Sequence, residues 1–195
     1  MRMFRDLLTL ALVAMVSMGS PMVAFAATPG VSVDVQARLA GSFKGSNDLG
    51  TPVFPFDVVK LTQFSPGAAS GLADLLFSDE RTLAASATEN LDLAGSLTSP
   101  LGSTLTFVKV KAIMIVAAAG NTNNVQVGGA ASNGFTGPFA DATDIVNIPP
   151  GGTLLLVHPT TGWTVTASTG DILKIANSGG TTGVTYKVVV IGATA

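Results

Sequence analysis

Turn-forming residues recur at short intervals through the second half of the chain and separate short β-rich segments. Each turn contains Gly, Pro or Asn, which either tolerate a positive φ or fix φ as a tight turn requires. A spacing of about 8 to 12 residues between such turns is typical of an antiparallel sandwich or barrel. We therefore expect about seven short strands over 105–195. The β-rich segments are Val125–Val127, Ile145–Ile148, Thr153–Val157, Trp163–Ala167 and Ile172–Ile175.

Three longer segments alternate apolar and polar residues, which predicts strands with one covered face. In 31–39 the apolar members are Val31, Val33, Val35, Ala37 and Leu39. In 107–116 an apolar face is expected from Val108, Val110, Ala112, Met114 and Val116, with Lys109 and Lys111 facing the other way. Near the end of the chain the apolar face comprises Val184, Tyr186, Val188 and Val190.

The middle of the chain is less periodic, with strand favoured over helix. The segments Val53–Leu61, Ala73–Leu83 and Glu89–Leu97 are expected to add strands to the same double sheet. Only Ser65–Gly71, with one Pro and two Gly, looks long enough as a loop to separate two parts. The sequence thus predicts an all-β fold: an antiparallel β-sandwich over 27–195, of which a jelly roll is one form.

The first 26 residues have the order of a secretory signal peptide. Arg2 and Arg5 precede an apolar run from Leu7 to Met18, a helix breaker follows at Pro21, and small residues flank Phe25. This predicts a signal-like helix over 1–26 with cleavage before Ala27. An amphipathic helix or a membrane anchor is the alternative, although the run is shorter than the roughly 20 apolar residues of a comfortable span.

Composition excludes several classes of function. The chain has no Cys and a single His, so it offers neither a thiolate nor a multi-His metal site. Charged residues make up 11% of the sequence and the formal net charge is −2, which leaves no basic patch for nucleic acid. We therefore expect a non-enzymatic protein without cofactor, without metal and without a nucleic-acid partner.

Few residues offer catalytic chemistry. His158 follows an apolar strand, but no Gly-x-Ser-x-Gly nucleophile motif accompanies it, so a half-exposed structural His is expected. Asp79 and Glu80 resemble a pair of glycosidase carboxylates in type only. Adjacent residues on a strand point to opposite faces, whereas such a pair must face one cleft.

Two further features could indicate ligand binding, one of calcium and one of sugar. Asp141, Asp144 and Asp171 lie in oxygen-rich loops, yet no Asp-x-Asp-x-Asp calcium motif is present and Asp is a common turn former. The single Trp, Trp163, would suggest a sugar-stacking platform if it were exposed. Its alternation with Val165 favours core packing instead.

The segment from Lys109 to Ala195 resembles small structural proteins of tailed bacteriophages, a poorly characterised family. The match extends more loosely upstream to Leu75–Leu83 and Leu91–Leu97. The matching stretches are Lys109–Ile113, Asn121–Ala130, Gly137–Phe139, Ile148–Leu156, Gly162–Thr166, Thr169–Asn177 and Val184–Ala193.

The resemblance implies a virion component, either a head decoration protein or a fibre or tail subunit, whose partners are further copies and other virion proteins. It supplies no functional residues. A component assembled in the host cytoplasm needs no signal peptide, so an exported surface module that binds carbohydrate, for example a cell-surface glycan, is the alternative. The chain is accordingly expected in a virion, or outside the cell if 1–26 is cleaved.

We place the assembly interface, as a hypothesis, at Phe135 and Phe139. These aromatics flank Gly137-Pro138 in a loop where burial in the core is less assured than on a strand. Apolar loop residues and strand edges of this kind can dock on neighbouring subunits. The hypothesis predicts that replacing both with Ser abolishes assembly and leaves the monomer folded.

Overall fold

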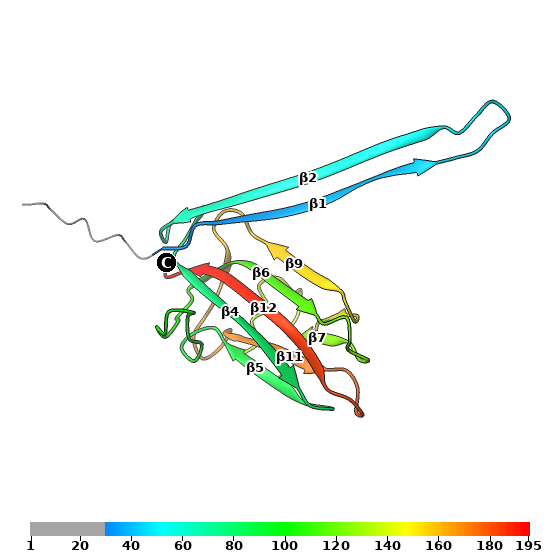
Figure 1. The fold of residues 1–195 in the computed structure, drawn as a ribbon. Helices are drawn as coiled ribbons and strands as arrows, with labels where there is room; N and C mark the ends of the chain where they lie inside the picture. Colours follow the sequence, from blue (N-terminus) through cyan, green and yellow to red (C-terminus); the bar gives the residue numbers. More distant parts are fainter. Residues whose placement is uncertain (1–29) are drawn as a thin grey trace, which may run out of the picture.

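The computed structural model describes residues 30–195, so the signal-like helix expected at 1–26 lies outside the described residues. The described chain is all-β, with mainly antiparallel sheets and no helix (Figure 1). Nothing in this range is a helix able to cross a membrane. The strands are β1 Val33–Lys44, β2 Val53–Pro66, β3 Leu72–Ala73, β4 Leu75–Leu83, β5 Thr88–Asp92, β6 Lys109–Ala117, β7 Val125–Gly128, β8 Ile145–Ile148, β9 Thr153–Val157, β10 Trp163–Thr164, β11 Ile172–Asn177 and β12 Val184–Ala193.

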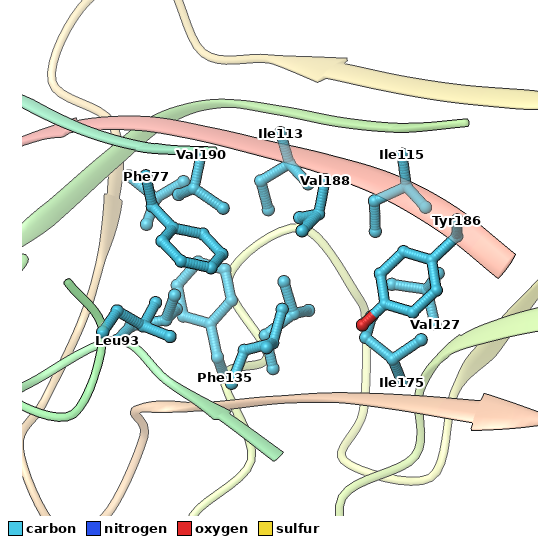
Figure 2. Packing of buried hydrophobic residues seen from close by; sticks show 14 of the residues in the cluster. Phe77, Leu93, Ile113, Ile115, Val127, Phe135, Ile175, Tyr186, Val188 and Val190 are labelled. Atoms are coloured by element: carbon cyan, nitrogen blue, oxygen red, sulfur yellow. The ribbon is translucent and has the colours of Figure 1, made fainter. Parts of the chain in front are cut away.

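Two sheets form the body of the molecule. One has the order β10-β6-β12-β4, with β9 also paired to β6, and the other has the order β5-β11-β7-β8. Side chains from both sheets meet in one hydrophobic core, where Phe77 and Val190 lie opposite Leu93 and Phe135 (Figure 2). The expectation that 73–83 and 89–97 contribute strands to the two sheets of the body is confirmed by β4 and β5.

Strand β12 shows how the alternating pattern produces this core. Val184, Tyr186, Val188 and Val190 are all buried in the main core, as the period of two predicts. Lys187 lies on the outer face and is exposed. The last strand of the chain thus lies in the middle of its sheet, between β6 and β4.

Strand β6 departs from the predicted pattern at one residue. The register passes from Ala112 opposite Ile191 to Val110 opposite Gly192, so Lys111 is the extra residue of a β-bulge. The bulge shifts the alternation, and therefore Val110 lies in the main core whereas Ala112 and Met114 face outward. The prediction that these three share one face is wrong for this reason.

Lys111 is itself buried, contrary to the expectation that it faces solvent. Its Nζ donates a hydrogen bond of 2.6 Å to the carbonyl oxygen of Thr160. Burial and the charge of Lys109 lower the pKa of Lys111. The bulge therefore turns the amine towards the 158–162 loop rather than into water.

Strands β1 and β2 form a long antiparallel hairpin, which we call the arm (residues 33–66). All twelve residues of β1 pair with β2, and the hairpin extends away from the body (Figure 1). The expectation that 53–61 joins the double sheet is therefore wrong, because these residues pair with β1 in a separate sheet of order β1-β2-β3. The 65–71 segment lies where β2 turns into β3, at the junction of arm and body.

The root of the arm packs on the outer face of the five-stranded sheet. A second hydrophobic cluster forms there, which joins Phe64 of β2 with residues of β3, β6 and β12. The amide nitrogen of Val31 also donates to the carbonyl oxygen of Ala73, 3.1 Å away. Among the described residues the arm is thus anchored at its root alone. The buried members of this cluster are Phe64, Ala73, Ala112 and Ile191.

Candidate functional site

The arm has two chemically different faces. Residues paired across an antiparallel hairpin share a face, so Leu39 with Val58 and Phe43 with Phe54 lie on the same side. Phe56, opposite Gly41, lies between them. We call Leu39, Phe43, Phe54, Phe56 and Val58 the distal apolar face.

The side chains of the distal apolar face are exposed. Phe43 keeps 74% of its surface accessible, Leu39 69%, Phe54 68%, Val58 66% and Phe56 40%. Scattered apolar residues are normal on protein surfaces, but a contiguous patch of this kind marks an interaction site. The distal apolar face is therefore the strongest candidate for a binding surface among the described residues.

The opposite face of the arm is more polar. Arg38 forms two hydrogen bonds with Asp57, at 3.0 and 2.8 Å, and Gln63 donates to Asp34 at 3.1 Å. Val59 and Leu61 interrupt this face, but charged and amide groups lie between them. Only one of the two faces is thus a continuous apolar surface.

A groove of about 350 Å³ lies beside the root of the arm, on the outer face of the five-stranded sheet. Val33 and Val35 of β1 form one side, and Met114, Leu155 and Val189 form part of the floor. Because the bulge at Lys111 turns Ala112 and Met114 outward, the floor is apolar. The body therefore presents a second open apolar surface.

Phe135 and Phe139, the residues expected at an interface, do not lie on an open surface. Phe135 is 3% exposed and belongs to the main core (Figure 2), and Phe139 is half-buried against that core. The amide nitrogen of Phe135 donates to the carbonyl oxygen of Ile172 at 2.9 Å, which fastens the loop to β11. The expectation that this loop escapes burial is wrong for Phe135, because that contact directs its ring between the sheets.

His158 and Trp163 lie together, in a structural arrangement. The two rings meet edge to face with centroids 5.4 Å apart, and His158 Nδ1 accepts a hydrogen bond of 3.1 Å from the amide nitrogen of Gly162. In the described part of the chain no carboxylate or hydroxyl is hydrogen-bonded to this imidazole. Trp163 packs against the main core, as the alternation predicts.

The acidic loop residues accept hydrogen bonds from neighbouring residues of their own turns. Asp141 Oδ1 accepts hydrogen bonds of 2.9 Å from both the amide and the hydroxyl of Thr143, and these bonds lower the pKa of Asp141. Asp144 caps the amide of Asp141, and Asp171 caps that of Ser168. Within 30–195 no group of three or more His, Asp or Glu is placed to hold a metal ion.

A polar cluster that the sequence did not reveal lies between the two sheets. Tyr186 is fully buried and donates its hydroxyl to Glu89, whose other oxygen pairs with Arg81 at 2.6 Å. Burial and the bond to Glu89 raise the pKa of Tyr186. Arg81 also pairs with Asp79 at 3.0 Å, while Glu80 faces Lys187 on the other side of the sheet. Asp79 and Glu80 thus point apart, as predicted.

Comparison with known proteins gives no family for this chain. A scan against protein-family models, a search of curated proteins and a search of solved structures each found no match. The arm and the groove are therefore the features of this chain that bear on its function. The alternation of Val53–Leu61 was weaker than that of 31–39, and the sequence offered no sign that the two strands pair only with each other outside the body.

Proposed function

We propose that this chain is a non-enzymatic structural subunit that assembles in multiple copies as a component of a phage virion, in a capsid decoration, fibre or tail. The observation that carries the proposal is the arm, which projects from a packed body and exposes one continuous apolar face. A structural subunit needs such a surface, because assembly buries it against a neighbour.

The body supports the proposal through its strand order, which agrees with the jelly-roll β-sandwich that we propose for it. If β4, β5, β6, β7, β8, β9, β11 and β12 are taken as strands one to eight, the first pairs with the eighth, the second with the seventh, the third with the sixth and the fourth with the fifth. A long hairpin rolled into two sheets has this pairing. Jelly rolls occur in viral capsid proteins and lectins.

The arm supports a structural role on energetic grounds. A two-stranded hairpin is marginally stable in water unless a third strand or another apolar surface covers it. Within the part of the chain that the structure describes, the arm has neither beyond its root, because β1 pairs only with β2 and the distal side chains are exposed. Assembly would supply the missing cover and would order the arm at the same time.

Neither catalysis nor sugar binding gains comparable support from the described residues. The imidazole of His158 is held by the amide of Gly162 and the edge of Trp163, so its contacts are those of a structural residue. The Trp163 ring that a glycan would need packs on the core. The polar cluster around Tyr186 lies between the sheets, where its groups pair with one another.

The proposal is tested by measuring the mass of the purified chain across a range of concentrations. We expect size-exclusion chromatography with light scattering to give a defined oligomer, and negative-stain microscopy to show rings, trimers or filaments. A species that stays monomeric at every concentration, on its own and with isolated particles of its phage, would overturn the proposal.

A further inference from the structure

The distal apolar face lies on the same side of the arm as residues that already pack within the chain, beyond the intervening pair Ala37–Lys60. Val33 and Val35, at the root of β1, point to the same side as Leu39 and Phe43 because they are separated by even numbers of residues. At the root this side covers the outer face of the five-stranded sheet, as part of the second hydrophobic cluster. The same face of one hairpin is therefore covered at its root and exposed beyond it.

The body of the same chain does not cover the distal half. Phe43 lies eight residues beyond Val35, or about 26 Å along an extended strand. The groove on the body is lined by β1 only at its root, from Val33 to Gln36. The arm extends away from the body (Figure 1), so the distal apolar face lies past its own groove.

The groove has the properties of a surface that accepts a strand. Its floor is apolar, and β1, which forms one side, pairs with β2 alone among the strands of residues 30–195, so its other edge is free of any strand in that range. An incoming extended segment would meet unpaired main-chain groups along β1 and apolar side chains beneath. A matching segment must itself be extended and apolar on one side.

We propose that the distal apolar face of one copy packs into the groove of another copy of this chain. This inference rests on the proposed function and names the two surfaces that meet. The chain carries both: five large apolar side chains on the arm, and Met114, Leu155 and Val189 on the body, beside Ala112 and Ile191, which the root of the arm already buries. The root of each arm already packs on this sheet, so the arm of a second copy would repeat a contact that the fold makes once.

Area and charge favour a second copy as the occupant. The five side chains expose roughly 600 Å² together, against about 800 Å² per partner in a stable interface, so reciprocal or repeated docking reaches the usual size. The paired positions from Leu39–Val58 to Phe43–Phe54 include no charged residue on this face, and neither does the groove floor. Asp34 lies on the β1 side of the groove, and Lys60, paired with Ala37, borders the distal apolar face on the same side of the arm. Docking of the five apolar side chains on the floor itself therefore buries no charge.

Single charges placed on the two surfaces test the proposal. On the arm, Val58→Lys alters the distal apolar face, and Val59→Lys puts the same charge on the opposite face one residue later. On the body, Met114→Lys alters the groove floor, and Thr82→Lys is the control at an exposed position on the same sheet face. All four sites are exposed, so the monomers should fold, which circular dichroism and thermal unfolding check.

Sedimentation of the full chain should show at least tenfold weaker self-association for Val58→Lys and Met114→Lys, and little change for the two controls. Mixing Val58→Lys with Met114→Lys should restore association, because the first retains an intact groove and the second an intact arm. Loss of assembly in Val58→Lys but not in Met114→Lys would overturn the inference and leave the proposed function standing. A wild-type chain that assembles only with another virion protein, or that binds only a glycan, would overturn the inference as well.

Discussion

Strands β1 and β12 have the same sequence pattern and opposite surroundings. In β12 every second residue from Val184 to Val190 is buried beneath the second sheet. In β1 the equivalent residues lose their cover beyond Val35, and Leu39 and Phe43 are exposed. A period of two therefore shows that side chains share a face, but it does not show what covers that face. In the body the cover is intramolecular, and for the arm we propose that it is a second copy.

The largest expected difference in stability is between alanine substitutions of two phenylalanines, one in the core of the body and one on the arm. Phe135→Ala removes a ring from the core and should lower the free energy of unfolding by about 3–5 kcal/mol. Phe54→Ala, on the distal apolar face, should change it by less than about 0.5 kcal/mol in dilute protein. Chemical denaturation followed by circular dichroism measures both. Equal losses would show that the arm is as well packed as the body.

This pair also replaces the prediction made for Phe135 and Phe139 from the sequence. A double Ser variant would lose assembly because the body unfolds, not because an interface is lost, since Phe135 lies in the core. Measuring stability and mass on the same sample separates the two causes. A double variant that stays folded but fails to assemble would support the interface first expected at Phe135 and Phe139.

A medium effect is expected from the polar cluster in the body. Tyr186→Phe removes the hydroxyl that donates to Glu89 and should cost about 2 kcal/mol at neutral pH, because a buried acceptor loses a partner. The raised pKa of Tyr186 means that the folded state keeps this proton at a pH where the unfolded chain releases it. Its contribution is therefore fully present below about pH 10 and is lost as the pH rises above that value.

Unfolding of the wild type and of Tyr186→Phe between pH 8 and pH 11.5 measures this dependence. Relative to the variant, the wild type should lose about 1.4 kcal/mol per pH unit above pH 10. Identical profiles would mean that the hydroxyl is accessible to water. The arm has no tyrosine, so the dependence is specific to the body.

The smallest effect should come from the ion pair on the arm. Arg38 and Asp57 are both more than half exposed, and exposed pairs contribute little because water and salt screen them. Arg38→Ala should lower the free energy of unfolding by less than about 0.5 kcal/mol. Arg81→Ala, which breaks pairs with Glu89 and Asp79 in the body, should cost clearly more. A reversed order in thermal unfolding would show that the arm carries stability of its own.

Much of the fold was predictable because turns and alternation are local signals. The strands predicted at 31–39, 107–116 and 184–190 are present, with the bounds Val33–Lys44, Lys109–Ala117 and Val184–Ala193. The predictions that were wrong concern features that depend on residues distant in the sequence. The side of Lys111 depends on a bulge opposite β12, and the burial of Phe135 depends on a contact with Ile172. The candidate site was not predicted for the same reason. The arm projects because β1 and β2 pair with each other and not with the strands of the two body sheets.

The hairpin geometry also limits how the arm can change length. Adding one residue to each strand would turn the distal apolar face to the opposite side of the arm, whereas adding two would return it to its present side. The reach of the arm can therefore grow or shrink only in steps of about 6.6 Å, two residues on each strand at a time. If neighbouring copies are joined as proposed, the number of paired residues in the arm would set the distance between subunits. The body would remain unaltered.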